Sequence, residues 1–192
     1  SGDLKITAGL QRFSTYGTLL FGFSLTFAAF DWIMSMEPNW YSTMFGVRVF
    51  GSSAVIGHAV IIYTTLRMKR SGMIGNEINK EHYHDLGKLQ FGFLVFWAYV
   101  SFSEFFLIWY ASIPEETIYY HRRWDAETWR FISASIVVFK FIFPFYLIMS
   151  RNVKRNPLPD PKRPLVPTLE TGALWLMLMQ FVEIYYWVMP NF

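Results

Sequence analysis

Six ionisable side chains lie inside long apolar stretches of this sequence: Asp31, Arg48, His58, Glu104, Lys140 and Glu183. A charged side chain costs about 3 kcal/mol or more in the middle of a bilayer, so it usually faces the interior of a helix bundle or a cavity. Groups of this kind form ion pairs between helices, relay protons or bind polar parts of a ligand. The six residues are therefore predicted to form a proton path.

Asp31 and Arg48 are predicted to form an ion pair, because each lies about one helical turn from the same end of two consecutive antiparallel spans. Either group alone would be an unpaired charge in a medium of low dielectric constant. A purely structural role, in which the pair fixes the register of the two helices, is an equally open interpretation.

The three carboxylates in these stretches face only two permanent bases, so at least one carboxylate lacks a countercharge unless His58 is protonated. Because burial disfavours the charged form of a carboxyl group, Glu104 or Glu183 is the candidate proton carrier. The alternative is that both groups make satisfied polar contacts between helices. His58 could contact a quinone head group, relay protons or bond a neighbouring carbonyl oxygen.

Metal and haem sites are not expected in this chain. It contains no cysteine, which excludes thiolate metal sites, iron–sulfur ligation and covalent haem attachment. A haem held by two histidines would need a second histidine at the depth of His58, whereas His82, His84 and His121 lie in predicted loops. The cluster at 82–85 lacks thiolates and further fixed ligands, so it is interpreted as part of a solvated loop.

The composition predicts an all-α integral membrane protein. Of its 192 residues, 53% are hydrophobic and only 16% are charged, whereas soluble domains carry about 25% charged residues. A helix needs about 20 mostly apolar residues to cross a bilayer. Five segments meet this requirement and predict a single transmembrane domain over residues 1–192, a four-helix bundle plus one helix, with spans at about 13–36, 44–66, 87–111, 127–149 and 171–189.

Charge distribution predicts the orientation of these spans. The N-terminal segment and the connections 67–86 and 150–170 hold most of the 17 lysines and arginines, which places the N-terminus in the cytoplasm and the C-terminus in the periplasm. This topology explains the basic stripe, so no nucleic-acid partner is expected. The connection 150–170 is rich in proline and is predicted to be an extended linker. Ile113–Glu116 is interpreted either as a docking loop or as a turn with acidic residues that start a helix.

Three motifs resemble those of a known family. They are Asp31–Pro38 followed by Trp40–Thr43, then His84–Lys88, and finally Phe96–Tyr99 running to Ile113–Thr117. Together they resemble the ActF subunits of bacterial alternative complex III, a quinol:cytochrome c oxidoreductase. The resemblance covers residues 31–117, and the rest of the chain fits in hydropathy and layout. Because the sequence begins Ser1-Gly2-Asp3, without an initiator methionine, we expect it to be part of a longer protein.

The resemblance implies a place in the bacterial cytoplasmic (inner) membrane and a ten-span subunit of which this chain is the C-terminal half. ActF is similar to the NrfD/polysulfide-reductase membrane subunits, which bind quinones, and is described as quinone-binding subunit 2. The implied partners are the sister quinol-binding subunit ActC, peripheral haem c and iron–sulfur subunits and, as a further candidate, a terminal oxidase. The implied cofactors are quinol or menaquinol, haem c and iron–sulfur clusters in the complex, with none bound by this chain.

The resemblance also bears on individual residues. Asp31 belongs to the first motif, and Glu104 lies between the matched parts of the third. The second motif contains His84, Asp85 and Lys88, which would form the cytoplasmic mouth of the proton path.

Three functions remain in competition. The first is a membrane subunit that supports quinol oxidation and electron transfer to a periplasmic acceptor and that conducts protons without a redox centre of its own. The second is a structural anchor that docks the haem c and iron–sulfur subunits. The third is a quinone-binding module around His58. A secondary transporter fits less well, because no inverted repeat or broken pair of helices is visible.

Overall fold

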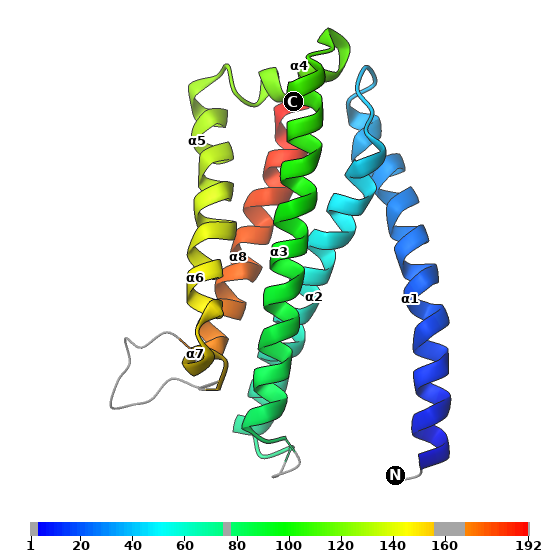
Figure 1. Ribbon diagram of the computed structural model, residues 1–192, viewed down its shortest axis with the longest axis vertical. Helices are drawn as coiled ribbons and strands as arrows, with labels where there is room; N and C mark the ends of the chain where they lie inside the picture. The colour runs from blue at the N-terminus through cyan, green and yellow to red at the C-terminus, as the bar shows by residue number, and fades with distance from the viewer. Residues whose placement is uncertain (1–3, 75–77, 156–167, 192) are drawn as a thin grey trace.

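The computed structural model describes residues 4–74, 78–155 and 168–191, and these ranges contain helices and turns but no strand (Figure 1). The elements are α1 (Leu4–Trp32), η1 (Met34–Met36), α2 (Thr43–Arg70), α3 (Lys80–Ala111), α4 (Pro114–Arg122), α5 (Glu127–Ser135), η2 (Ile136–Ile142), α6 (Phe143–Met149), α7 (Arg151–Arg155), α8 (Leu169–Val188) and η3 (Met189–Asn191).

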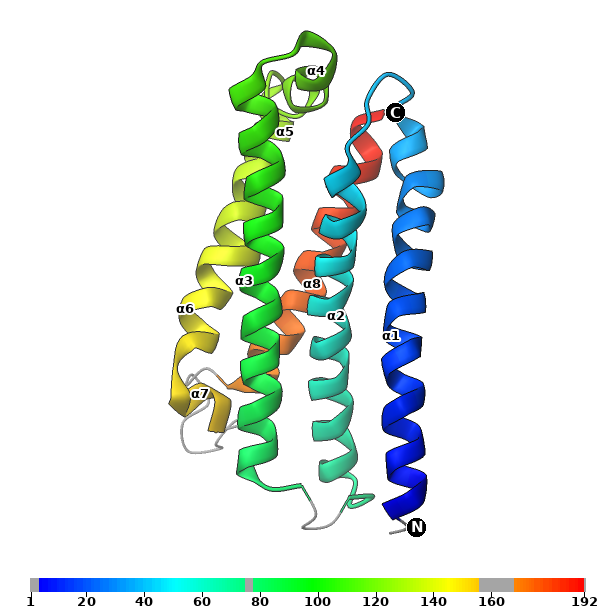
Figure 2. The same ribbon diagram turned by 45° about the vertical axis from the view of Figure 1, so that its right-hand side comes forward.

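Helices α2, α3 and α8 form a bundle with the continuous helix made of α5, η2 and α6, and α1 packs beside α2 at the edge of this bundle (Figures 1 and 2). We call the end that carries α4 and the chain's C-terminus the upper end, and the end that carries the N-terminus and α7 the lower end (Figure 1). The arrangement agrees with the predicted four-helix bundle plus one helix.

Four helical segments are long and apolar enough to cross a membrane: Ala8–Met36, Thr43–Arg70, Lys80–Ala111 and Glu127–Met149. These segments indicate a membrane protein. The fifth predicted span, 171–189, forms the helix α8, but it is not among the four. Glu170, Gln180 and Glu183 lower the hydropathy of α8, and all three side chains are used in contacts with other helices.

The predicted loop 67–86 is wrong for most of its length, because α2 continues to Arg70 and α3 already begins at Lys80. Asn79 caps α3: its side-chain oxygen accepts hydrogen bonds from the backbone N–H groups of Glu81 (2.9 Å) and His82 (3.2 Å). The Nδ1 atom of His82 in turn accepts a hydrogen bond from the backbone N–H of Asn79 at 3.2 Å, which completes a capping box. His82, His84 and Asp85 therefore lie on a helix and not in a loop.

The other two connections also contain helix. Ile113–Glu116 is a helix start, because Pro114 occupies the first turn of α4 and Glu115 and Glu116 follow it there. This agrees with the second interpretation of that segment. In the predicted linker 150–170, the ends are helical in α7 and α8, and the middle, 156–167, lies outside the described residues.

A π-helical turn separates α5 from α6. It spans Ile136–Ile142, and the backbone N–H of Phe143 bonds to the carbonyl of Val138, five residues earlier. Pro144 follows directly and has no N–H with which to continue the α-helical pattern. Turns of this kind change the direction of the side chains that they carry. Lys140 lies in this turn, and its side chain is fully buried.

At the upper end, Arg123 ties three elements together. Its guanidinium donates to Glu37 Oε1 at 3.0 Å and to the backbone carbonyl oxygens of Tyr186 (3.3 Å) and Trp187 (3.2 Å). It also lies 3.6 Å from the centre of the Tyr119 ring. The chain after α1, the helix α4 and the end of α8 are thereby fixed to one another.

The contact between α1 and α2 generates a testable prediction. A Cβ atom on Gly46 would clash with Thr26 Cγ2, whereas no atom lies within 4 Å of the corresponding position on Gly57. Gly46→Leu should therefore push α1 away from α2, and Gly57→Leu should leave the helix pair unchanged. Cross-linking of cysteines introduced at Phe21 and Phe50, whose rings are 6.2 Å apart, measures this separation in a chain with no native cysteine. Equal cross-linking in both variants would contradict the assigned packing.

Candidate functional site

Glu183 is the centre of a buried polar cluster. Its side chain is completely inaccessible, and Trp97 Nε1 donates to its Oε1 atom at 2.9 Å. Its Oε2 atom accepts a hydrogen bond from Ser52 Oγ and forms an ion pair with Lys140. These residues come from α2, α3, η2 and α8, so each of the four bundle helices contributes one group. We call these four residues, with Gln180, the central cluster.

Gln180 completes the central cluster. Its Oε1 atom accepts hydrogen bonds from Lys140 Nζ (3.1 Å) and from Ser52 Oγ (2.9 Å). Ser52 in turn accepts from Lys140 Nζ at 2.9 Å. Since a hydroxyl group has one proton, Ser52 can donate either to Gln180 or to Glu183 at a given moment. The cluster therefore offers two hydrogen-bond arrangements around the same carboxylate.

A second ion pair lies on the upper side of the central cluster. Arg48 Nη1 is 3.2 Å from Glu104 Oε2, and the two residues are 6% and 2% exposed. Glu104 Oε1 accepts a hydrogen bond from Ser42 Oγ at 2.7 Å. The Arg48 guanidinium also lies 5.7 Å from the centre of the Trp187 ring. We call Arg48 and Glu104 the upper pair.

The upper pair and the central cluster lie at successive levels of the bundle. Arg48 and Ser52 are four residues apart on α2, and Trp187 and Glu183 are four apart on α8, so each step is about 6 Å along the helix axis. Together, the upper pair and the central cluster form one row of buried charged and polar groups, the charge row.

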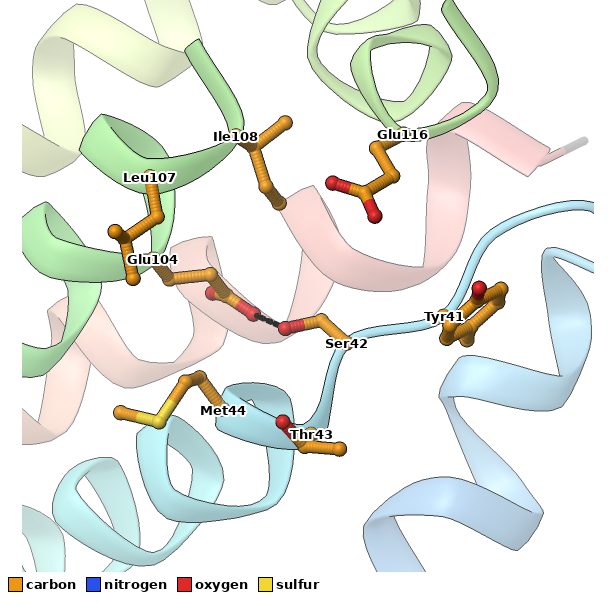
Figure 3. Close-up of a pocket in the computed structure, with 8 residues that line it drawn as sticks. All are labelled: Tyr41, Ser42, Thr43, Met44, Glu104, Leu107, Ile108 and Glu116. Carbon is orange, nitrogen blue, oxygen red and sulfur yellow. Dashed lines mark hydrogen bonds between the residues drawn. The ribbon is translucent and has the colours of Figure 1, made fainter. Parts of the chain in front are cut away.

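The charge row ends at a pocket. Figure 3 shows Glu104 and Ser42 joined by a hydrogen bond, with Glu116 of α4 across the opening. The pocket has a volume of about 210 Å³ and is lined by Tyr41, Ser42, Thr43, Met44, Glu104, Leu107, Ile108 and Glu116. Glu104, one partner of a buried ion pair, thus lines a pocket near the upper end of the bundle.

Two phenol groups border this region from α4. Burial raises the pKa of Tyr119 and of Tyr120, so both hydroxyl groups keep their protons at neutral pH. Neither hydroxyl has a hydrogen-bond partner within the described ranges. The upper pair therefore has neutral hydroxyl groups nearby and no further fixed charge from these side chains.

The predicted ion pair between Asp31 and Arg48 is wrong, because Arg48 pairs with Glu104. Asp31 is exposed on α1 and forms no ion pair with any residue that the structure describes. The two residues do lie on neighbouring helices, but Arg48 points toward α3 and α8, away from α1. Of Asp31, Glu104 and Glu183, the carboxylate without a basic partner among the described residues is Asp31.

His58 lies outside the charge row. Its Nδ1 atom is 2.8 Å from the carbonyl oxygen of Ala54, one turn earlier on α2, and its ring lies 4.8 Å from that of Phe93. The histidine thus bonds a neighbouring carbonyl, which is one of the three predicted possibilities.

The predicted cytoplasmic mouth, His84, Asp85 and Lys88, lies at the lower end of α3 (Figure 1). Lys88 Nζ bonds Asp85 Oδ1 at 2.8 Å. Between this group and the central cluster, α3 contributes Gln90 and Leu94, which are both completely buried. Gln90 Nε2 donates to the backbone carbonyl oxygen of Val55 at 3.1 Å. The structure does not bring the mouth residues into contact with the charge row.

Sequence reasoning did not single out Ser42, Ser52 or Trp97 as site residues, although helical register carries a signal for two of them. Ser52 lies one turn from Arg48, and Trp97 lies two turns from Glu104 on the same face of α3. Ser42 precedes α2 and is placed by tertiary structure alone.

Within residues 4–74, 78–155 and 168–191, no three or more His, Asp or Glu side chains gather in a way that could hold a metal ion. Comparison with protein-family models finds no match to this chain, and comparison with curated proteins finds none either.

The pairing of Arg48 with Glu104 generates a second prediction. Arg48→Gln or Glu104→Gln alone should lower the free energy of unfolding in detergent micelles by about 3 kcal/mol, because each leaves an uncompensated buried charge. The double variant should lose clearly less than the sum of the single losses. The matched control combines Arg48→Gln with Asp31→Asn, and these effects should add to within about 0.5 kcal/mol. Coupling between Asp31 and Arg48, with none between Arg48 and Glu104, would reverse the assignment.

Proposed function

We propose that this chain is a membrane subunit of a quinol-oxidising respiratory complex of the ActF type, and that the charge row conducts protons within it. The motifs between residues 31 and 117 support the family, and the four apolar helices support the membrane location. The chain would support quinol oxidation and electron transfer to a periplasmic acceptor without a redox centre of its own. ActC and the haem c and iron–sulfur subunits would carry the quinol site and the electrons.

The observation that carries the proposal is the succession of two buried ion pairs, Arg48–Glu104 and Lys140–Glu183, from the pocket to the centre of the bundle. Arginine does not lose its proton in proteins, so Arg48 stays cationic and Glu104 is the member of the upper pair that can change its charge. Lysine can lose its proton when buried, so Lys140 and Glu183 can exist as an ion pair or as a neutral pair. In the proposed path, a proton passes between Glu104 and Glu183, which belong to successive levels of the charge row, while a cation remains beside each carboxyl group.

The proposed topology connects this path to the protons that quinol oxidation releases. We propose that α8 is a fifth span, that the N-terminus is cytoplasmic and that the upper end faces the periplasm of a bacterial inner membrane. Oxidation of a quinol releases two protons, and the pocket beside Glu104 would receive or deliver them at that side. Ser52 would switch its hydrogen bond between Gln180 and Glu183 as Glu183 gains or loses a proton.

The structural anchor is the second candidate, and one observation favours it. Both carboxylates of the charge row have a basic partner within the bundle, as expected for groups whose role is to hold helices together. The two functions differ in their consequences. An anchor loses assembly when a pair is broken, whereas a proton path loses coupling in a complex that still assembles.

We therefore predict the effect of Glu183→Gln on the intact complex in sealed vesicles. The variant keeps the size of the side chain but loses its charge and one hydrogen-bond acceptor, so the yield of assembled complex should fall. The haem spectrum and subunit masses of the complex that does assemble should be unchanged. Proton release coupled to quinol oxidation should fall by about tenfold or more, since a group that transfers protons contributes at least that much. Glu115→Gln, an exposed carboxylate of α4, is the matched control and should behave as wild type.

Three outcomes would contradict parts of the proposal. Normal coupling in Glu183→Gln would exclude Glu183 as a proton carrier. Loss of subunits without a selective coupling defect would establish the anchor. Finally, a preparation from native membranes without haem or quinol:cytochrome c reductase activity would remove the ActF assignment itself.

A further inference from the structure

Lys154 occupies an unusual position at the lower end of the bundle. It belongs to α7, and its side chain is only 9% exposed. The aliphatic stem crosses α3 at Gly87, where a Cβ atom would lie 2.7 Å from Lys154 Cγ. The ammonium group lies 5.4 Å from the centre of the Phe91 ring. Only glycine at position 87 leaves room for this path.

The ammonium group of Lys154 has no anionic partner among the residues that the structure describes. The neighbouring acids are used by other bases, since Asp85 pairs with Lys88 and Glu81 pairs with Arg155. Burial lowers the pKa of Lys154, and the positive charge of Lys88 lowers it further. A bound anion would offset both effects.

A second group beside Lys154 also lacks a partner. The Nδ1 atom of His84 is buried and makes no hydrogen bond within the described part of the chain. His84 lies close enough to Lys88 and Lys154 for their charges to act on it. The ammonium group of Lys154, that of Lys88, which also bonds Asp85, and the unbonded imidazole nitrogen of His84 thus lie on one side of α3.

We propose that Lys154, Lys88 and His84 bind the phosphate group of an anionic phospholipid between α3 and α7. Phosphate oxygens are strong acceptors for ammonium and imidazole donors. Basic sites between membrane helices at the depth of the head groups select anionic lipids. This site is independent of the proposed proton path, and it gives the predicted mouth residues His84 and Lys88 a different role.

The position of the site favours a lipid over free phosphate as its ligand. Lys154 follows α6 by only a few residues, which places it at the end of a candidate membrane span. The rings of Phe91 and Phe145, 5.1 Å apart, form an apolar surface directly beside it. An acyl chain can lie against these rings while the phosphate meets the ammonium groups.

The test is native mass spectrometry of the full chain in detergent, titrated with phosphatidylglycerol. Wild-type protein should retain one lipid, and Lys154→Gln should weaken this binding about fivefold, the loss expected for one basic residue near a lipid surface. Lys88→Gln serves as a second variant and should weaken binding to a similar extent. Lys80→Gln is the matched control, because Lys80 is exposed on the same helix and should leave binding unchanged.

Two results would overturn the proposal. If Lys154→Gln, Lys88→Gln and Lys80→Gln all bind phosphatidylglycerol as wild type does, the lipid does not occupy this site. If inorganic phosphate displaces the lipid from wild-type protein and binds with the same dependence on Lys154, the ligand is free phosphate. If wild-type protein retains the lipid in excess inorganic phosphate and Lys154→Gln does not, the result supports the lipid site. This test measures lipid binding and not proton release, so its outcome is independent of the test of the charge row.

Discussion

The buried ion pair between Lys140 and Glu183 is the contact on which the rest of the bundle depends. Both side chains are completely inaccessible, and removing one partner of such a pair costs about 3–5 kcal/mol. The pair needs Ser52 and Trp97 to supply its remaining hydrogen bonds. Four helices must therefore meet at one level, and the π-helical turn before Pro144 directs Lys140 toward that point.

The two halves of the charge row are chemically different, and the difference matters for the proposed path. In the upper pair, Arg48 keeps its proton and its charge is fixed. Glu104, which lines the pocket, is the group whose protonation changes in the proposed path. In the central cluster both partners can change protonation, and Ser52 can follow them by turning its hydroxyl. On the lower side, Leu94 and Val55 are fully buried. The buried Gln90 bonds the carbonyl oxygen of Val55 and no member of the central cluster. The polar route that the described residues form thus reaches from the upper end to the middle of the bundle.

The sequence predicted the positions of the helices better than the pairs that their side chains form. Apolar runs located the span 127–149, and the helical elements from α5 to α6 occupy the same residues. The lower ends of α2 and α3 were missed. The helix α2 runs on to Arg70, and Asn79 and His82 form a cap at the start of α3 that hydropathy does not register. Asp31 and Arg48 were matched by depth alone. Depth does not say which side of α2 carries a residue, and Arg48 points to α3 and away from α1. Lys140 and Glu183 were both identified, but their contact depends on how non-consecutive helices pack.

The central claim is that a carboxyl group of the charge row changes its protonation during quinol oxidation. Infrared difference spectroscopy of the intact complex, recorded between its oxidised and reduced states, measures this change directly. The account predicts a carboxyl C=O band that shifts in heavy water and disappears in Glu183→Gln or Glu104→Gln, but persists in Glu115→Gln. An infrared difference spectrum identical in all three variants and wild type would contradict it and leave the charge row with a structural role.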